Sequence, residues 1–297
     1  MLRRWSSSSG LRRRGGVASA SLACALSWLL AAPVAAAPPQ RIVSLNLCTD
    51  QILVDLVPRE RISAVSHLAA DPLVSAVAEK ARGIPWTRGE AEAVLSYAPD
   101  LVIAGEYTTP ATVALLERLG LRVLKVPLAS DIAGVRTVTY QIADAVGARG
   151  EADVLIAEFD RRLGALGPSV ASEPPTAVVY QVNSLAAGSG SLADAVLRAA
   201  GFRNLAGELG LGSGGQLALE ALVAKPPDVI VLSGPVNEYR TAVAENLRHP
   251  ALAALMRSRW SVTLPWRLWL CATPHLADAI ERLAAVRHEL GWSRAVR

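Results

Sequence analysis

The sequence predicts an α/β fold with two lobes, each with a mainly parallel sheet covered by helices, joined by a single long connecting helix. Two observations lead to this class. From residue 41 the chain alternates apolar runs of strand length with stretches of helical periodicity. One helix-and-strand unit also occurs twice, as "GEAEAVLSYAPDLVIAG" at 89–105 and "QLALEALVAKPPDVIVLSG" at 216–234. A repeat at this spacing is too long for a solenoid and indicates two related lobes.

Each copy of the repeated unit predicts a helix that begins near a glutamate, ends before a proline and leads into a buried strand. Three pairs of residues, each pair 128 positions apart, carry the repeat: Glu92 and Glu220, Pro99 and Pro227, and Asp100 and Asp228.

The other elements follow in order along the chain. The first lobe has strands at 41–45, 61–66 and 121–127 and helices at 49–57 and 112–120. Residues 131–166 keep helical periodicity, interrupted only by Gly147 and Gly150, and a loop follows at 167–175. The second lobe has strands at 176–182 and 260–265 and helices at 191–201, near 250–256 and at 274–290. We therefore predict lobes at 37–147 and 169–297, with the connecting helix at 148–168.

Residues 1–36 have the pattern of a cleavable secretory signal peptide. A basic start is followed by an apolar stretch that ends in small residues, and cleavage after Ala36 fits the "VAA" sequence before it. A transmembrane anchor is the alternative, because the apolar run is long enough to span a membrane. Cys24 makes a poor lipoprotein site, since it follows "SLA" and much of the apolar run comes after it. We expect a periplasmic protein.

Composition favours a folded chain that does not bind nucleic acid. Hydrophobic residues make up 52% of the chain and charged residues 19%, which is ample for sizeable cores. Cleavage would remove five of the 30 basic residues and leave 25 against 26 acidic ones, a net charge of about −1. The basic character of the full chain therefore belongs to its leader and predicts no nucleic-acid partner.

A ligand cleft is predicted at the carboxyl ends of the strands, where open parallel sheets bind their ligands. Two polar loops, "NLCTD" at 46–50 and "NSLAAGSGS" at 183–191, follow the first strand of each lobe and should face this cleft. The second loop lacks the third glycine and the acidic partner of a dinucleotide-binding fingerprint.

These units resemble the periplasmic substrate-binding proteins of ABC importers for cobalamin and iron chelates, over essentially the whole mature chain. The resemblance implies a bilobal binding protein, expected here to be monomeric, that delivers its ligand to an ABC permease in the inner membrane. It also implies that Glu92 and Glu220 dock onto permease arginines. Trp86 stands six residues before Glu92, where cobalamin binders carry a cleft tryptophan, but the matching position before Glu220 is Gly214. Corrinoid, ferric siderophore and haem stay open as ligands.

Several residues near strand ends are candidate ligand contacts. Trp86 lies in a loop, where it either packs inward or contacts ligand. His67 follows a predicted strand and is either a surface residue or a ligand contact. Within "LPWRLWLCATPH", Arg267 could pair with an anionic chelate or stay solvated, and Trp266 or Trp269 could reach the ligand.

Cys48 and Cys271 each follow a strand that should end at the cleft, one in each lobe. They could form a disulfide between the lobes, remain buried as thiols, or face the ligand. The rival to a binding protein is a periplasmic enzyme with Cys48 as nucleophile and His67 or His275 as base. No third orienting group stands at a recognisable spacing, and the four histidines form no metal-binding pattern. We predict no catalytic residues, no metal site and no cofactor.

Overall fold

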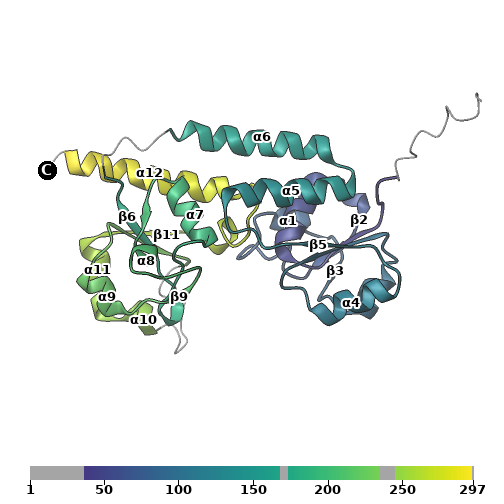
Figure 1. Ribbon diagram of the computed structural model, residues 1–297, viewed down its shortest axis with the longest axis horizontal. Helices are drawn as coiled ribbons and strands as arrows, with labels where there is room; N and C mark the ends of the chain where they lie inside the picture. The colour runs from purple at the N-terminus through teal and green to yellow at the C-terminus, as the bar shows by residue number, and fades with distance from the viewer. Residues whose placement is uncertain (1–36, 168–172, 235–244, 296–297) are drawn as a thin grey trace, which may run out of the picture. The chain divides into compact units, whose positions relative to one another are not determined.

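The computed structural model describes residues 37–167, 173–234 and 245–295 (Figure 1). Its N-terminal lobe has a five-stranded parallel sheet in the order β3-β2-β1-β4-β5. The strands are β1 (Ile42–Ser44), β2 (Ile62–Ser66), β3 (Trp86–Thr87), β4 (Leu101–Gly105) and β5 (Val123–Val126). The helices are α1 (Leu47–Leu56), α2 (Ala78–Ala81), α3 (Ala91–Ser96), α4 (Pro110–Arg118) and α5 (Ile132–Val146). The predicted parallel α/β fold is confirmed for this lobe.

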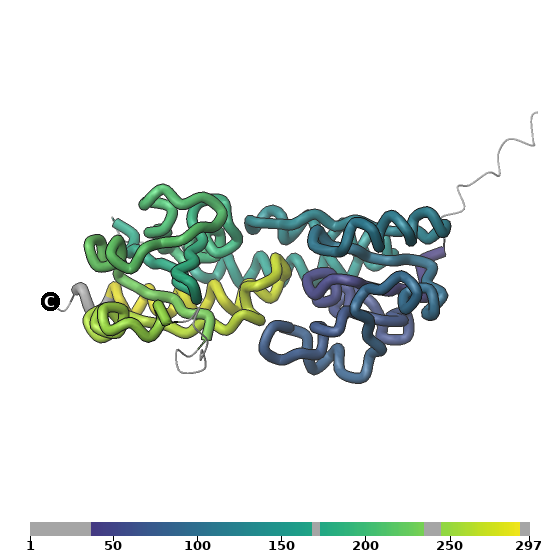
Figure 2. The backbone as a smooth tube through the Cα atoms, turned by 90° about the horizontal axis from the view of Figure 1, so that it is seen from below, coloured from purple at the N-terminus to yellow at the C-terminus, as the bar shows by residue number. Residues whose placement is uncertain are grey.

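The C-terminal lobe has a four-stranded parallel sheet in the order β11-β10-β6-β8 and a small antiparallel pair, β7-β9. Its strands are β6 (Thr176–Val179), β7 (Leu185–Ala186), β8 (Arg203–Asn204), β9 (Gly215–Gln216), β10 (Val229–Leu232) and β11 (Trp260–Thr263). Its helices are α7 (Leu192–Ala199), α8 (Leu205–Glu208), α9 (Leu219–Ala224), α10 (Glu245–Arg248), α11 (Pro250–Ser258) and α12 (Leu276–Ala295). Figure 2 shows the purple-to-blue part of the chain and the green-to-yellow part meeting near the middle of the view.

The central strands β1, β4, β6 and β10 are buried on both faces, which explains why they are continuous apolar runs. Successive residues point to opposite faces, so Ile42 packs against one core of the N-terminal lobe and Val43 against another. In the C-terminal lobe, Val229 and Ile230 divide in the same way between two cores. Strands of this kind keep a rigid carboxyl edge for a binding site.

The repeated Pro-Asp pair fixes each helix-and-strand unit to the first strand of its lobe. The Asp100 carboxylate accepts hydrogen bonds from the backbone N–H groups of Gln40 and Arg41, just before β1. The Asp228 carboxylate likewise accepts from the backbone N–H and the hydroxyl of Thr176, at the start of β6. The aspartates therefore have the same structural role in both lobes.

The predicted helical stretch at 131–166 forms two helices, α5 and α6 (Arg149–Ala165). Gly147 ends α5 with a φ of 68°, a left-handed conformation that glycine adopts without strain. Helix α6 then runs alongside α5 and α12 (Figure 1). Its Ala152 is buried in a core of the N-terminal lobe and its Phe159 in a core of the C-terminal lobe. Arg162 adds ion pairs of 2.6 and 2.5 Å to Asp278 and Glu281 of α12.

Residues Pro38–Arg297 cluster as one compact unit. The division into lobes at 37–147 and 169–297 with a sole connecting helix at 148–168 stays a prediction. The predicted signal peptide at 1–36 lies outside the described residues. Within the described part of the chain, no helix is both long enough and apolar enough to cross a membrane.

Candidate functional site

A cavity of about 250 Å³, named here the cleft cavity, opens where β1, β4 and β5 end. The N-terminal lobe lines it mainly with residues that follow these strands, among them Asn46, Cys48, Gly105, Glu106, Tyr107 and Leu128. The C-terminal lobe contributes Leu270, Cys271 and Ala272, from the segment before α12. This is the carboxyl edge at which parallel α/β proteins bind ligands. Asn46–Thr49 line this cavity, which supports the expectation that the 46–50 loop faces the cleft.

The start of α1 forms part of the cavity wall and is held there by Asn46. The Asn46 side chain accepts a hydrogen bond of 2.9 Å from the backbone N–H of Cys48 and thereby caps the helix. Gly105, at the end of β4, lies so close that a Cβ atom on it would approach the Asn46 Cγ atom to 2.6 Å. Glycine at 105 thus allows the strand end and the helix cap to meet in the cavity wall.

The rim of the cleft cavity is apolar. Leu68, Leu128 and Leu270 are exposed, and the side chain of Tyr107 is 78% exposed. Glu106 is the one charged side chain among the described residues that line the cavity. Exposed apolar groups gathered around a cavity are typical of a surface that binds an apolar partner or ligand.

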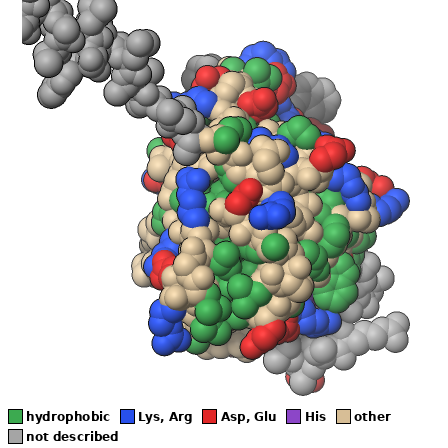
Figure 3. Space-filling model, turned by 90° about the vertical axis from the view of Figure 1, so that its right-hand side faces the viewer, with side chains coloured by type: hydrophobic (Ala, Val, Ile, Leu, Met, Phe, Trp, Pro, Cys, Tyr) green, Lys and Arg blue, Asp and Glu red, His purple; other side chains and the backbone are tan. Residues whose placement is uncertain are grey.

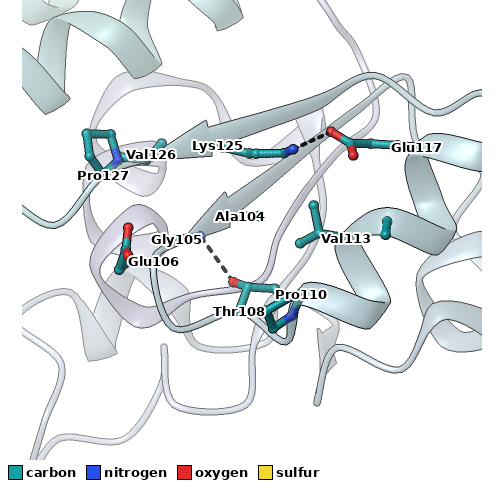
Figure 4. Close-up of a pocket in the computed structure, with 11 residues that line it drawn as sticks. Ala104, Gly105, Glu106, Thr108, Pro110, Val113, Glu117, Lys125, Val126 and Pro127 are labelled. Atoms are coloured by element: carbon teal, nitrogen blue, oxygen red, sulfur yellow. Dashed lines mark hydrogen bonds and ion pairs between the residues drawn. The ribbon is translucent and has the colours of Figure 1, made fainter.

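A second hollow of about 360 Å³ lies next to the cleft cavity, between β4, β5 and α4 (Figure 4). The two share Gly105, Glu106, Val126 and Pro127 at the strand ends. Figure 4 shows Lys125 of β5 paired with Glu117 of α4 across this hollow, at 2.8 Å. Because Lys125 is neutralised by that partner, the hollow adds no free basic group beside the cleft cavity.

Cys48 and Cys271 form a disulfide, so the first of the three possibilities for these cysteines is the one observed. Their Cα atoms are 5.1 Å apart, and both residues line the cleft cavity. Nearby, His275 Nε2 and Asp55 Oδ2 lie 2.7 Å apart and link the start of α12 to α1. In the disulfide-bonded chain Cys48 has no free thiol, which removes the nucleophile required by the rival enzyme hypothesis.

Asp55 is the nearly buried partner in that link, with Lys80 Nζ 2.5 Å from its other oxygen. Burial by itself would raise the pKa of this carboxyl, but the hydrogen bonds and charges of His275 and Lys80 outweigh burial and lower it. Asp55 is therefore ionised and anchors α1 at both carboxylate oxygens.

Trp86 begins the two-residue strand β3 and lies near His67, which directly follows β2; both are outside the residues that line the cleft cavity. The Trp86 side chain is 56% exposed, and its ring centroid is 6.5 Å from that of His67. The Arg88 guanidinium stands 5.8 Å from the centroid of the Trp86 ring. An exposed indole fits the predicted ligand contact better than the packing alternative, and the ligand role itself remains a prediction.

The expectation for Trp269 is not supported. Its side chain is only 5% exposed, lies in a core of the C-terminal lobe and stacks on Trp266 with centroids 5.0 Å apart. Its indole N–H donates a 3.0 Å hydrogen bond to the carbonyl oxygen of Leu264. With both its ring and its polar atom satisfied inside the lobe, Trp269 has a structural role. Arg267 is exposed between these tryptophans, and among the described residues no side chain pairs with it.

Glu92 and Glu220 occupy equivalent exposed positions. Each is the second residue of a six-residue helix, α3 or α9, that leads into a buried strand, β4 or β10. Glu220 also borders a polar recess of about 570 Å³, named here the α9 recess. The loop expected at 183–191 contributes Asn183 and Ser184 to this recess and does not line the cleft cavity, because β7 pairs with β9 and holds it near α9.

Residues 42–256 match the family described as periplasmic binding protein. This chain belongs to that family. The cobalamin-binding protein of Halobacterium salinarum is 30% identical to this periplasmic binding protein over 218 residues, which are 72% of this chain and 58% of the relative. The matched stretch thus spans less than two thirds of the relative's length.

Solved structures support the same fold. The periplasmic heme-binding protein RhuT from Roseiflexus sp. RS-1 superposes with a TM-score of 0.70 at 24% identity, over 84% of this chain and 98% of that one. The periplasmic vitamin B12 binding protein BtuF of Vibrio cholerae superposes with a TM-score of 0.65 at 19% identity, over 84% and 97% of the two chains. Each of these proteins is named for binding a ligand and not for converting it.

The sequence did not single out Glu106, Tyr107, Leu128 or Leu270 as site residues of this periplasmic binding protein. The signal for the first three was present, because they directly follow β4 and β5 at the edge predicted to bind ligand. Leu270 had a weaker signal, its position next to Cys271. It reaches the cavity beside the Cys48–Cys271 disulfide, which the sequence left open.

Asp50 of α1 is a buried carboxyl behind the cleft wall. Its Oδ2 atom accepts hydrogen bonds from the backbone N–H and the hydroxyl of Ser66, whereas Oδ1 has no partner among the described residues. Burial raises the pKa of Asp50 to about 7, although the nearby hydroxyls of Ser44 and Ser66 partly offset it. The folded chain therefore holds this proton more tightly than the unfolded chain does.

We expect the free energy of unfolding to fall as pH rises from about 4 to about 7, because the unfolded chain loses the Asp50 proton at lower pH than the folded chain. Asp50→Asn should lack this slope and exceed the native chain in stability above pH 7, by on the order of 4 kcal/mol. Urea unfolding of both chains at pH 5 and pH 8 measures the difference. Equal pH dependence in the two chains would contradict an elevated Asp50 pKa.

Proposed function

We propose that this periplasmic binding protein captures a corrinoid or an iron chelate and delivers it, chemically unchanged, to an ABC permease in the inner membrane. The observation that carries the proposal is the cleft cavity, whose apolar rim lies at the carboxyl edge of the N-terminal sheet and is completed by the C-terminal lobe. The predicted signal peptide would send the chain to the periplasm.

The chemistry of the cleft suits a large ligand that is partly apolar. Its volume of about 250 Å³ lies below the usual pocket range of roughly 300 to 1,000 Å³, so such a ligand would extend over the exposed rim. Tyr107 and the leucines of the rim offer apolar contact, and Glu106 favours a neutral or cationic edge over an anionic one. The cobalamin-binding relative and the heme-binding and vitamin B12 binding neighbours support this ligand class.

The disulfide agrees with a carrier that delivers its ligand without reacting with it, because the bond occupies both cysteines at the cleft. Within the described residues, no three His, Cys, Asp or Glu side chains gather closely enough to hold a metal ion. On one end of the N-terminal lobe, basic and acidic side chains are interspersed (Figure 3). This face therefore does not present the clustered basic residues that nucleic-acid binding requires.

Identification of the bound ligand tests the proposal. The protein is isolated without denaturation from cells supplied with cobalt and iron, then analysed by absorption spectroscopy and native mass spectrometry. A corrinoid, haem or ferric chelate bound at one molecule per chain is the expected result. Retention of a sugar, peptide or amino acid in preference to these chelates would reject the proposed ligand class.

Two substitutions test the contact residues. We expect Tyr107→Ala and Trp86→Ala each to weaken binding of cyanocobalamin or haemin, whichever the native chain binds, by roughly five- to tenfold, since each removes an exposed aromatic face. Fluorescence or absorption titration gives the affinities. Trp260→Ala is the matched control, because Trp260 is also exposed but begins β11 and is remote from the carboxyl edge. An unchanged affinity in Trp86→Ala would assign Trp86 a structural role only.

A further inference from the structure

The hollow of about 360 Å³ beside the cleft cavity, named here the side pocket, lies between the sheet and α4. Ala104 of β4 is the register partner of Lys125 of β5, and both line the pocket. Val113 and Ala114 of α4 line it from the other side. Small side chains at 104 and 114 leave room between strand and helix. The side pocket meets the cleft cavity at the four residues that line both.

Glu106 lines both spaces and stands in a tight turn after β4. The backbone N–H of Gly105 donates to the hydroxyl oxygen of Thr108 at 3.1 Å, and the backbone N–H of Thr108 donates to the carbonyl oxygen of Gly105 at 3.0 Å. These two bonds close the turn and hold the backbone of Glu106 in place. Among the described residues, the Glu106 carboxylate has no hydrogen-bond or ion-pair partner. It is therefore available to accept hydrogen bonds from a ligand.

The other polar groups of the side pocket restrict what can enter it. Because the Thr108 oxygen accepts from Gly105, its own hydrogen is available to donate. Figure 4 shows Glu106 and the Lys125–Glu117 pair on opposite sides of the pocket. An anionic group would meet the charge of Glu106 without an unpaired cation among the described residues that line the pocket, and like charges brought together cost free energy. A primary amide can both donate to Glu106 and accept from Thr108.

We propose that the side pocket receives an uncharged arm of the bound chelate, a primary amide that donates to Glu106 and accepts from the Thr108 hydroxyl. This inference rests on the proposed function and names the chemistry of the ligand at that site. The apolar rim of the cleft cavity contacts the ring of the chelate, and the side pocket selects among the arms on the ring. Haem carries carboxylate arms, whereas a corrinoid ring carries primary amides. The side pocket therefore favours a corrinoid over haem.

Cyanocobalamin and its monocarboxylates, in each of which one amide arm is hydrolysed to a carboxylate, separate the charge of an arm from its shape. We expect the native mature chain to bind one monocarboxylate roughly tenfold more weakly than cyanocobalamin, or by about 1.4 kcal/mol, because the altered arm meets Glu106. The other monocarboxylates should bind nearly as cyanocobalamin does. Absorption titration at pH 7 gives the affinities. Equal affinity for cyanocobalamin and all of its monocarboxylates would overturn the proposal.

Substitutions of the pocket carboxylates assign the loss of affinity to particular residues. Glu106→Gln keeps an acceptor oxygen and removes the charge, so it should bind cyanocobalamin nearly as the native chain does and accept the disfavoured monocarboxylate almost equally well. Glu117→Gln should also improve binding of that monocarboxylate, because it frees Lys125. Glu151→Gln is the matched control, since Glu151 is exposed on α6 and lines neither space. A Glu106→Gln chain that discriminates as strongly as the Glu151→Gln chain would show that Glu106 does not face the arm.

Filling the side pocket tests the space itself. Ala114→Trp should weaken binding of cyanocobalamin by at least roughly tenfold, because the indole occupies the place of the arm. Ala111→Trp is the matched control, since Ala111 is also an exposed alanine of α4 but does not line the pocket. Equal affinities in the two tryptophan variants would show that no arm enters the pocket.

A comparison of ligands separates this inference from the function on which it rests. A native chain that binds haemin or a ferric siderophore more tightly than cyanocobalamin would overturn the amide-arm inference and leave the proposed capture of a chelate standing. A native chain that binds none of these chelates would reject both.

Discussion

Replacement of Cys48 and Cys271 by serine is expected to lower the free energy of unfolding by about 5 kcal/mol and the melting temperature by roughly 10 °C. The disulfide joins residues that are 223 positions apart, so it removes much of the freedom of the unfolded chain. The expected loss of about 5 kcal/mol follows from the entropy of closing a loop of this length in the unfolded chain. Calorimetry of the native and doubly substituted chains without reductant measures the difference.

The same substitution should also change how the lobes open. The bond ties the start of α1 in the N-terminal lobe to the segment before α12 in the C-terminal lobe, at the wall of the cleft cavity. Without it, the His275 and Asp55 pair remains as a link between these helices. We expect small-angle scattering of the free variant to show a larger radius than the native chain, and ligand to reduce that difference.

Reductant supplies the control for both measurements. Dithiothreitol should bring the native chain to the stability and radius of the serine variant and leave the variant itself unchanged. A native chain whose melting temperature and radius match those of the variant under oxidising conditions would show that the two cysteines are not joined in solution.

The fold could be predicted because its determinants are local and repeated. Apolar strands buried on both faces, the glutamate-opened helices and the Pro-Asp pairs recur in both lobes, and each has a consequence that can be read within a few residues. Short elements such as β3, β8 and the β7-β9 pair escaped prediction. Two-residue strands carry no periodicity, and their pairing is decided by neighbours distant in sequence.

The candidate site was only partly predictable, because its residues are combined by tertiary contacts. Cys48 lay in the correct loop, but its bond to Cys271 depends on how the two lobes meet, which no sequence spacing states. The position of Trp269 after a predicted strand makes it a candidate ligand contact. Stacking on Trp266 and a hydrogen bond to Leu264 place it inside the lobe instead. Position along the chain identifies an edge of the sheet, whereas packing decides which side chains reach it.

Charge reversal at both repeated glutamates is expected to abolish transport while ligand affinity stays within about twofold of the native value. Glu92 and Glu220 are exposed in the first turns of α3 and α9, and neither lines the cleft cavity. We propose that each meets a cation of the permease, as the family resemblance implies. Glu92→Lys with Glu220→Lys would place like charges together at both contacts, which costs several kcal/mol and should exceed the effect of alanine.

The geometry explains why the two positions should act together. Asp100 and Asp228 fix each helix-and-strand unit to the first strand of its lobe, so the carboxylates are carried on rigid backbone. Two charges at a set separation orient the protein on its partner, which one charge cannot do. Either single reversal should therefore reduce uptake substantially, and the double reversal should reduce it by at least a hundredfold, given like-charge repulsion of several kcal/mol.

Transport is measured as uptake of radiolabelled ligand into proteoliposomes that contain the permease. Ligand affinity is measured by titration of the same protein samples. Glu151→Lys is the matched control for each single reversal, because Glu151 is also an exposed glutamate in the first turn of a helix, α6, and its replacement by lysine makes the same change in net charge as one reversal. Raising the salt concentration should weaken permease binding of the native chain and of Glu151→Lys alike, and should weaken it less in Glu92→Ala. A double reversal that lost its ligand but still associated with the permease would show that these glutamates belong to the binding site, and the docking assignment would be withdrawn.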